Sequence, residues 1–234
     1  MVKFFSCLLK KRNMVGSLPV HYVDTKYEKA TFGMGCFWSG ESLFGGQIGV
    51  LRTKVGYSGG TSPTAKYREI GDHVECVSVD YDPKKISYKQ LLDLFWNNHE
   101  YGLTKRVKRQ YSSLILYHTD AQKQAAMESI QEERVKRAPE IIITEIAEAG
   151  PFHPAEDYHQ KFRLQAHKEF VKSLQLNSEL LLKSFVAAKL NGYLVGVGGL
   201  KQFEKESSEL GLSPTQLEYV RKYVIKNAGA GLSC

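Results

Sequence analysis

Apolar residues in the first third of the chain form short runs typical of buried strands. Their β-branched and aromatic content predicts strands over 29–34, 50–57 and 74–81. The first strand leads directly into Gly35-Cys36-Phe37-Trp38, and the following residues, 39–44, indicate the first turns of a helix. The chain therefore changes from strand to helix at Cys36.

Helical spacing continues the pattern after Ser87. Ser87 is predicted to cap a helix that runs to about His99, because apolar side chains recur there at intervals of three and four. Further along, the pattern predicts a strand over 111–118, a helix over 120–137 and a strand over 140–147. A long helical stretch is then predicted to open near Ala155.

This alternation predicts an α/β (α+β) fold with a two-layer sandwich over 22–176. Three more helices are predicted over 180–190, 202–210 and 214–226, with Asn191-Gly192-Tyr193 ending the first of them. The expected organisation is a flexible N-terminal segment (1–21), a main domain (22–176), a small helical C-terminal appendage (177–226) and a mobile tail (227–234).

The composition is that of a globular protein, with 234 residues, 42% hydrophobic and 24% charged. A formal net charge of +7 fits an ordinary basic enzyme, although it leaves nucleic acid or an anionic surface open as a partner. No apolar run reaches the roughly 18–20 residues that a membrane span needs. The first 20 residues are basic and contain no acid, which allows a mitochondrial presequence, but a cytoplasmic protein is the main prediction.

The four cysteines are widely scattered and are Cys7, Cys36, Cys76 and Cys234. Without a CxxC pair or dense spacing, neither a structural zinc site nor a secreted disulfide framework is expected. The spacing favours a reducing compartment and one or two working thiols, with no metal.

Cys36 is the candidate nucleophile because of its place before the predicted helix. Unpaired backbone N–H groups and the helix dipole stabilise a thiolate at such a position. The alternative is a buried, inert cysteine, which is common for a lone thiol in a core.

Phe37 and Trp38 follow at once, and an exposed aromatic side chain there can bind a methyl group or a thioether. Packing against the sheet is the alternative for both rings.

Glu75 is the candidate acid because it enters a hydrophobic strand. Desolvation there can raise the pKa of a carboxyl group, so that it stays protonated near neutral pH. A solvated charge at a strand edge is the alternative. Tyr67 and Tyr111 are candidate hydrogen-bond donors, although neither stands out among 13 tyrosines.

Together these segments resemble the A-type methionine sulfoxide reductases. The resemblance covers about Thr31–Phe162, and the combination of motifs is far more specific than any one of them. The matching segments are Gly35-Cys36-Phe37-Trp38, Val55-Gly56-Tyr57-Ser58-Gly59-Gly60, Asp72-His73-Val74-Glu75, Tyr81-Asp82-Pro83, Gln110-Tyr111-Ser112-Ser113 and Ala155-Glu156-Asp157-Tyr158-His159-Gln160.

The resemblance implies a ferredoxin-like sandwich, with 22–176 as the catalytic reductase domain. It implies that Cys36 attacks the sulfur of a methionine S-sulfoxide while Glu75 protonates the oxygen. Tyr67 and Tyr111 are then expected to bind that oxygen, and Phe37 and Trp38 to hold the methyl group. The resulting sulfenic acid condenses with a second thiol, and thioredoxin, or dithiothreitol in vitro, reduces the disulfide. Free methionine sulfoxide or oxidised proteins and peptides are the expected substrates, and no bound cofactor is needed.

Two departures from the family pattern bear on this chemistry. Lys105–Arg109 is strongly basic, with Arg106 roughly where relatives carry an acid, so it either tunes nearby groups or is a solvated loop. The usual resolving cysteine after Asn-Gly-Tyr is missing, because Leu194 follows Tyr193. Cys234 on the terminal tail is the candidate replacement, Cys76 is expected in the core, and an unused terminal thiol is the alternative.

Two other functions remain as alternatives. The first is a non-catalytic relative that binds methionine-rich or oxidised partners, which the altered basic loop suggests. The second is a nucleic-acid-binding protein that uses Lys105–Arg109, although the sequence carries no motif for it. Nothing in the pattern requires more than a monomer.

Overall fold

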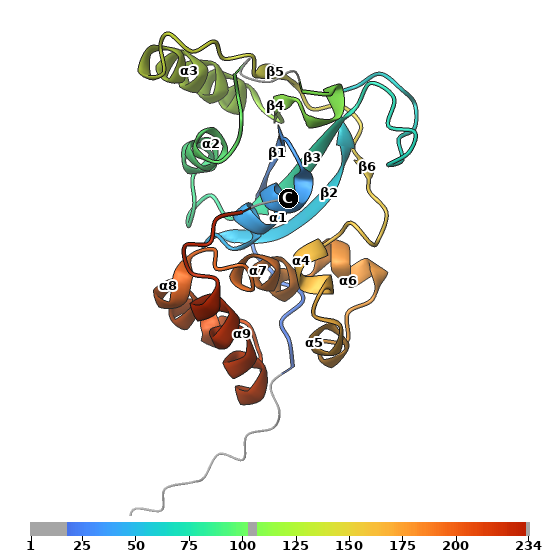
Figure 1. The fold of residues 1–234 in the computed structure, drawn as a ribbon, viewed down its shortest axis with the longest axis vertical. Coiled ribbons are helices and arrows are strands. Elements are labelled where there is room, and N and C mark those ends of the chain that lie inside the picture. Colours follow the sequence, from blue (N-terminus) through green and yellow to red (C-terminus); the bar gives the residue numbers. More distant parts are fainter. Residues whose placement is uncertain (1–17, 103–106, 233–234) are drawn as a thin grey trace, which may run out of the picture.

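The computed structural model describes residues 18–102 and 107–232, which form one sheet with helices around it (Figure 1). The strands are β1 (Glu28–Met34), β2 (Val50–Ser58), β3 (Val74–Tyr81), β4 (Ser113–Tyr117), β5 (Glu145–Glu148) and β6 (His153–Pro154). The helices among them are α1 (Phe37–Gly45), α2 (Tyr88–Asn97) and α3 (Asp120–Lys136), with a 3₁₀ turn η1 (Arg109–Tyr111) before β4. After β6 come α4 (Phe162–Gln165), α5 (Lys168–Ser173), α6 (Ser178–Lys183), α7 (Phe185–Tyr193), α8 (Gly199–Glu206), a second 3₁₀ turn η2 (Ser207–Glu209) and α9 (Pro214–Lys226).

The sheet has the strand order β5-β4-β1-β3-β2-β6 and is mixed, because only β4 and β5 pair in parallel. One face is apolar and is covered by α1, α2 and α3. The core on this face joins Phe32 and Val77 of the strands to Phe44, Leu91 and other helix side chains. Since side chains alternate along a strand, the neighbouring positions point to the opposite face.

The helices after β6 enclose a second apolar core. It is built from side chains such as Phe185, Leu190 and Val220, together with Leu164 and Phe170, which precede residue 177. Side chains from both sides of the predicted boundary at 176–177 thus share one core. The division of the chain into these domains stays a prediction.

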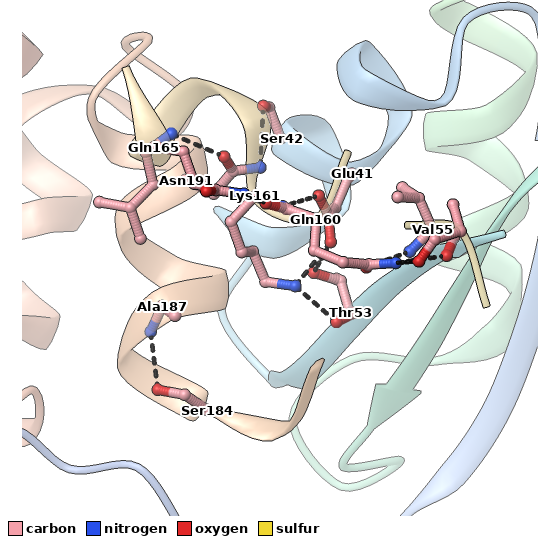
Figure 2. Close-up of polar contacts among 12 residues, drawn as sticks. Glu41, Ser42, Thr53, Val55, Gln160, Lys161, Gln165, Ser184, Ala187 and Asn191 are labelled. Carbon is pink, nitrogen blue, oxygen red and sulfur yellow. Dashed lines mark hydrogen bonds and ion pairs between the residues drawn. The ribbon is translucent and has the colours of Figure 1, made fainter. Parts of the chain in front are cut away.

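A buried polar network joins α1 to the segment before α4 (Figure 2). The Lys161 ammonium donates to Glu41 Oε1 at 2.6 Å and to the Thr53 carbonyl at 2.7 Å, and both charged side chains are fully buried. The Lys161 backbone N–H also donates to Glu41 Oε2 at 2.7 Å. Because removing one member of a buried ion pair typically costs about 3–5 kcal/mol, this network fixes α1 and the Cys36 end of it.

The long helix predicted near Ala155 is wrong. Residues 157–161 form turns, and the short helix α4 begins only at Phe162. His159, Gln160 and Lys161 are all buried, and each bonds a different partner in the interior. These contacts with distant parts of the chain override the local helical pattern.

The predicted helix end at Asn191-Gly192-Tyr193 is also wrong, because α7 continues to Tyr193. Asn191 is buried, accepts from the Leu164 backbone N–H at 3.0 Å and donates to Ser42 Oγ at 3.1 Å. A Cβ on Gly192 would lie 2.5 Å from the Gly46 Cα. The glycine therefore lets α7 cross α1 closely and does not end the helix.

Two predicted strands are shorter than expected. The strand predicted over 111–118 begins at Ser113, because Tyr111 belongs to η1. Of the strand predicted over 140–147, only the end belongs to β5; before it, Ile142 makes an isolated bridge to Gly102 while Ile141 and Ile143 are exposed. Strand β3 and helix α9 have the predicted bounds, and Ser87 caps α2 as expected.

Candidate active site

Cys36 lies where β1 turns into α1, as the sequence predicts. Gly35 before it has a φ of 84°, which favours glycine, and Cys36 itself is the extended N-cap residue of α1. Its thiol is partly exposed. The first N–H groups of α1 and the positive end of its dipole therefore lie beside a sulfur that a substrate can reach.

Glu75 is brought to the same end of α1 by β3. Its carboxyl group is 2% exposed, and Oε2 accepts from the backbone N–H of Phe37 at 3.1 Å. Oε1 accepts from the Gln110 side-chain amide at 2.6 Å. The solvated strand edge considered from the sequence is therefore wrong for Glu75, which is buried and held next to Cys36 in the chain fold.

Tyr67 and Tyr111 meet beside this carboxyl group. A hydrogen bond joins their side chains, and the pKa of Tyr111 is raised to about 12, by burial first and then by the charge of Glu75. The charge of Cys36 contributes in the same direction, which places the sulfur close to this phenol. Tyr111 thus keeps its O–H proton at neutral pH and can donate it. The Tyr67 backbone N–H donates to Glu156 at 3.1 Å, which anchors the segment that carries this tyrosine.

Phe37 and Trp38 form the aromatic side of the site. Phe37 is 1% exposed, whereas Trp38 is half-buried and stacks on Phe162 with ring centroids 3.7 Å apart. The Trp38 indole N–H donates to His159 Nδ1 at 3.2 Å. Burial lowers the pKa of His159, so the ring is neutral and Nδ1 can accept this bond.

A cavity of about 510 Å³ gathers the predicted site residues. Its lining includes Cys36, Phe37, Trp38, Tyr67, Glu75 and Tyr111. Leu232, near the end of the described chain, lines this cavity as well. It packs against the core between the sheet and helices α1, α2 and α3. The C-terminal segment therefore runs back from α9 to α1, as the red trace in Figure 1 shows.

Of the three remaining cysteines, the structure describes only Cys76. Cys76 is fully buried, as expected, and burial raises the pKa of its thiol to about 12, so it stays protonated and inert. Cys7, Cys234 and Arg106 lie outside the described residues.

Arg109, from the basic loop, donates to the carbonyls of Asp72 and Gly59 at 3.2 Å each and also pairs with Glu145. Arg109 therefore ties the loop to the sheet.

Three contributors were not among the predicted site residues. Gln110 and His159 belong to motifs that resemble the family, but their partners, Glu75 and Trp38, are distant in sequence. The spacing of apolar residues carries no signal for such contacts. Leu232 lies in a tail of glycine and alanine, where only its apolar side chain marks it out.

Within 18–102 and 107–232, no group of three or more His, Cys, Asp or Glu could hold a metal ion. Over the same ranges, no helix is long and apolar enough to cross a membrane.

Comparison with known proteins agrees with this geometry. The family model described as peptide methionine sulfoxide reductase matches residues 28–190, and the helical domain of selenoprotein methionine sulfoxide reductase A matches residues 175–225. A peptide methionine sulfoxide reductase of Drosophila melanogaster is 56% identical over 233 residues, covering 100% of this chain and 95% of that protein. Peptide methionine sulfoxide reductase A5 of Oryza sativa subsp. japonica is 44% identical over 71% of this chain and 67% of that protein.

Two solved structures are similar as well. Methionine sulfoxide reductase A of Corynebacterium diphtheriae aligns with a TM-score of 0.56 and 29% identity, over 63% of this chain and 82% of that one. Reduced Mxr1 from Saccharomyces cerevisiae aligns with a TM-score of 0.54 and 28% identity, over 64% of this chain and 91% of that one. The chain belongs to the peptide methionine sulfoxide reductase A family and carries that family's C-terminal helical domain.

Proposed function

We propose that Cys36 performs the sulfoxide reduction of this family with Glu75 as its acid. The observation that carries the proposal is one cavity lined by both a thiol at a helix N-terminus and a buried carboxyl group. The helix N-terminus favours the thiolate, and burial favours the neutral carboxyl group that can give up a proton. The Phe37 N–H and the Gln110 amide donate to Glu75 and orient its carboxyl group. These bonds favour the charged form and so oppose the effect of burial on its protonation.

The chemical step is a two-electron transfer. The Cys36 thiolate attacks the sulfoxide sulfur, Glu75 protonates the oxygen, and the sulfur–oxygen bond of the substrate breaks. Methionine leaves reduced, and Cys36 carries the oxygen as a sulfenic acid, oxidised by two electrons. Tyr67 and Tyr111 hold the oxygen by hydrogen bonds before it leaves, while Phe37 and Trp38 hold the methyl group.

The regeneration step uses Cys234 as the resolving thiol. Its sulfur attacks the Cys36 sulfenic acid, which releases water and leaves a disulfide. Leu232 supports this assignment because it lines the cavity of Cys36, and two residues of chain reach at most about 7 Å further. Cys76 is excluded by its burial and its raised pKa.

The reductant we propose is thioredoxin, whose dithiol takes over the disulfide and becomes oxidised in turn; dithiothreitol replaces it in vitro. The substrates we propose are oxidised proteins and peptides as well as free methionine S-sulfoxide. An accessible sulfur in an open cavity of about 510 Å³ fits both sizes of substrate.

Three broader proposals complete this function. The central strand order β4-β1-β3-β2, with α1 and α2 on one face, supports a ferredoxin-like two-layer arrangement for the sheet. A cytoplasmic location, with mitochondria as the alternative, rests on the sequence of residues 1–20 alone, and these lie mostly outside the described ranges. We also propose a monomer, because nothing in the sequence pattern requires a second copy of the chain.

A turnover experiment tests the catalytic roles. The full-length protein should reduce methionine S-sulfoxide with dithiothreitol, whereas Cys36→Ser should show no turnover above background. Equal activity in both would overturn the assignment. An inactive parent protein would instead support the non-catalytic alternative.

Disulfide mapping tests the resolving thiol. After one turnover without reductant, mass mapping should find a Cys36–Cys234 disulfide. A disulfide to Cys76 or Cys7, or a stable sulfenic acid on Cys36, would overturn the role of Cys234.

A further inference from the structure

The face of the sheet opposite to α1, α2 and α3 carries a cluster of cations. Lys29 of β1 and Arg52 of β2 both stand opposite Asp80 of β3 in the strand register. Lys54, two residues after Arg52, stands opposite Ser78 and points to the same face. Three cations therefore surround a single carboxylate on neighbouring strands.

Asp80 is already shared between two of these cations. Its Oδ1 accepts from Lys29 Nζ at 2.5 Å and its Oδ2 accepts from Arg52 Nε at 3.0 Å. In the part of the chain that the structure describes, Lys54 makes no ion pair, and its ammonium lies 5.2 Å from the centre of the Phe152 ring. One half-buried positive charge on this face thus has no carboxylate of its own.

The pKa values of two titratable groups are lowered by burial and by the same surplus of positive charge. Burial lowers the pKa of Lys54, and the charge of Lys29 lowers it further, more than Asp80 raises it. His118, whose Nε2 lies 2.9 Å from Thr31 Oγ1 on the same face, has a pKa lowered by burial and then by Lys29, again ahead of Asp80. Both groups therefore lie in a region where the cations dominate.

The three cations and Asp80 line a cavity of about 400 Å³, a size typical of small-molecule sites. Tyr22 and Tyr27 form an aromatic wall, and both rings are more than half exposed. The Arg52 guanidinium lies 4.5 Å from the Tyr27 ring centre. Lys183 of α6 borders the cavity but pairs with Glu179 at 3.0 Å, so it adds no net charge. This cavity and the Cys36 cavity have no lining residue in common.

We propose that this cavity binds a small-molecule oxyanion, with Lys54 holding the phosphate or carboxylate group and Tyr22 and Tyr27 packing against an aromatic or apolar body. An anion there supplies the counter-charge that Lys54 lacks, and a charge-assisted hydrogen bond to an ammonium is among the stronger polar contacts. The exposed tyrosine rings gain apolar contact from the body of the ligand. This site does not depend on the sulfoxide chemistry.

Calorimetric titration of the full-length protein with phenyl phosphate tests the proposal. We expect saturable binding to one site, and Lys54→Met should weaken it about tenfold, as expected for the loss of one charge-assisted contact. Lys201→Met removes the same charge from an exposed position on α8 and should leave the affinity unchanged. Equal weakening in both variants, or binding that does not saturate, would overturn the site.

Two further arms identify the ligand chemistry. Tighter binding of phenyl phosphate than of benzoate assigns a phosphate ligand, and the reverse assigns a carboxylate; binding of neither overturns the proposal. Inorganic phosphate should bind more weakly than phenyl phosphate, and equal affinity would overturn the role of Tyr22 and Tyr27. Retained sulfoxide reduction with dithiothreitol shows that Lys54→Met is folded, and Lys54→Gln replaces it if that variant is inactive.

Discussion

Glu75 accepts one hydrogen bond on each carboxyl oxygen, and this fixes the group more tightly than burial alone. The Phe37 N–H comes from the first turn of α1, so the helix that follows Cys36 also holds the Glu75 carboxyl group. Gln110 supplies the other bond from the segment before β4. In the proposed reaction, the substrate oxygen meets a carboxyl group whose orientation is set before binding.

Glu75→Gln should separate proton donation from orientation. Glutamine has nearly the same shape and can still accept from the Phe37 N–H, but it cannot protonate the sulfoxide oxygen. We expect kcat with dithiothreitol to fall about 10²–10⁴-fold, the usual range for losing an acid. Glu69→Gln, an exposed position in the segment before β3, is the control and should keep parent activity. A kcat within twofold of the parent would rule out Glu75 as the acid.

His159 positions Trp38 through its neutral ring. Since the indole N–H donates to Nδ1, the imidazole proton sits on Nε2, which lies 3.9 Å from Glu156. Burial lowers the pKa of His159 below 6.5, so Nδ1 accepts at neutral pH. When the pH falls through that lowered value, Nδ1 gains a proton and can no longer accept. The contact with Trp38 is then lost.

His159→Phe should therefore raise KM for the sulfoxide about tenfold, because an unpaired buried donor costs about 1–3 kcal/mol. The effect on kcat should be smaller, since the side chain does not touch the reacting atoms. Steady-state kinetics and the tryptophan emission spectrum check both points. His153→Phe on β6 makes the same change away from Trp38 and should leave KM as it is. A parent-like KM in His159→Phe would contradict the positioning role.

At the scale of elements, the crossing of α1 and α7 sets the direction of the helix that begins at Cys36. The two helices approach so closely that a Cβ on Gly45 would lie 2.4 Å from the Ala188 carbonyl oxygen. Gly192 meets Gly46 in the same way from the other side. Helix propensity and packing make opposite demands at these positions, and packing prevails.

Gly192→Ala tests which demand is larger. In a helix on its own, alanine is better than glycine by about 1 kcal/mol, so propensity alone predicts stabilisation. Overpacking against Gly46 typically costs about 1–3 kcal/mol, and we expect the variant to have the lower free energy of unfolding in urea. Gly150→Ala, with nothing within 4 Å of the added Cβ, should change that free energy little. A more stable Gly192→Ala would show that the helices can move apart.

Elements with strong local signals could be predicted from the sequence, and those shaped by distant contacts could not. Ser87 and Gln90 form a capping box at α2, and Pro214 begins α9 after its cap Ser213, so both helices start as predicted. The turns around Lys161 depend on Glu41, 120 residues away, and a window of a few residues contains no trace of it. The same holds for the site. Cys36 and Glu75 follow from motifs, whereas the contact of His159 with Trp38 appears only in the folded chain.

For the whole molecule, histidines that the fold keeps neutral make stability sensitive to acid. Burial lowers the pKa of several of them, namely His21, His99, His118, His159 and His167. The pKa of His99 falls to about 4, while its ring bonds the Phe95 carbonyl and the Ser113 hydroxyl at 2.6 and 2.7 Å. Between pH 6.5 and 4 the unfolded chain therefore binds more protons than the folded one, and stability falls as the pH falls.

His99→Gln should flatten this dependence. His99 alone accounts for a loss on the order of 3 kcal/mol over that interval, since one pKa unit is worth about 1.4 kcal/mol. Urea unfolding at several pH values between 7.5 and 4.5 measures the slope in parent and variant. Carboxyl groups titrate alike in both proteins, so the difference isolates the histidine. Equal slopes in parent and variant would show that folding does not lower the pKa of His99.

The C-terminal segment couples the helical region to the catalytic cavity. It leaves α9 at Lys226, turns at Gly229 and Gly231 with φ of 74° and 73°, and runs back toward α1 (Figure 1). Leu232 at its end lines the cavity of Cys36. Anchoring by Leu232 keeps any thiol two residues further on at a high effective concentration near Cys36. In the proposed reaction the substrate binds in the cavity that Leu232 lines, so a looser tail should slow regeneration without slowing attack.

Cys234→Ser should therefore lose most thioredoxin-supported turnover and keep the turnover supported by dithiothreitol, which reaches the sulfenic acid directly. Leu232→Ser should slow disulfide formation in a single turnover, because the tail loses its apolar contact with the core. Ser233 neighbours both positions, and Ser233→Ala serves as the control, with thioredoxin turnover like the parent. If Cys234→Ser kept full activity with thioredoxin, the tail would not regenerate Cys36. If only Leu232→Ser were unchanged, the thiol would reach Cys36 without this anchor.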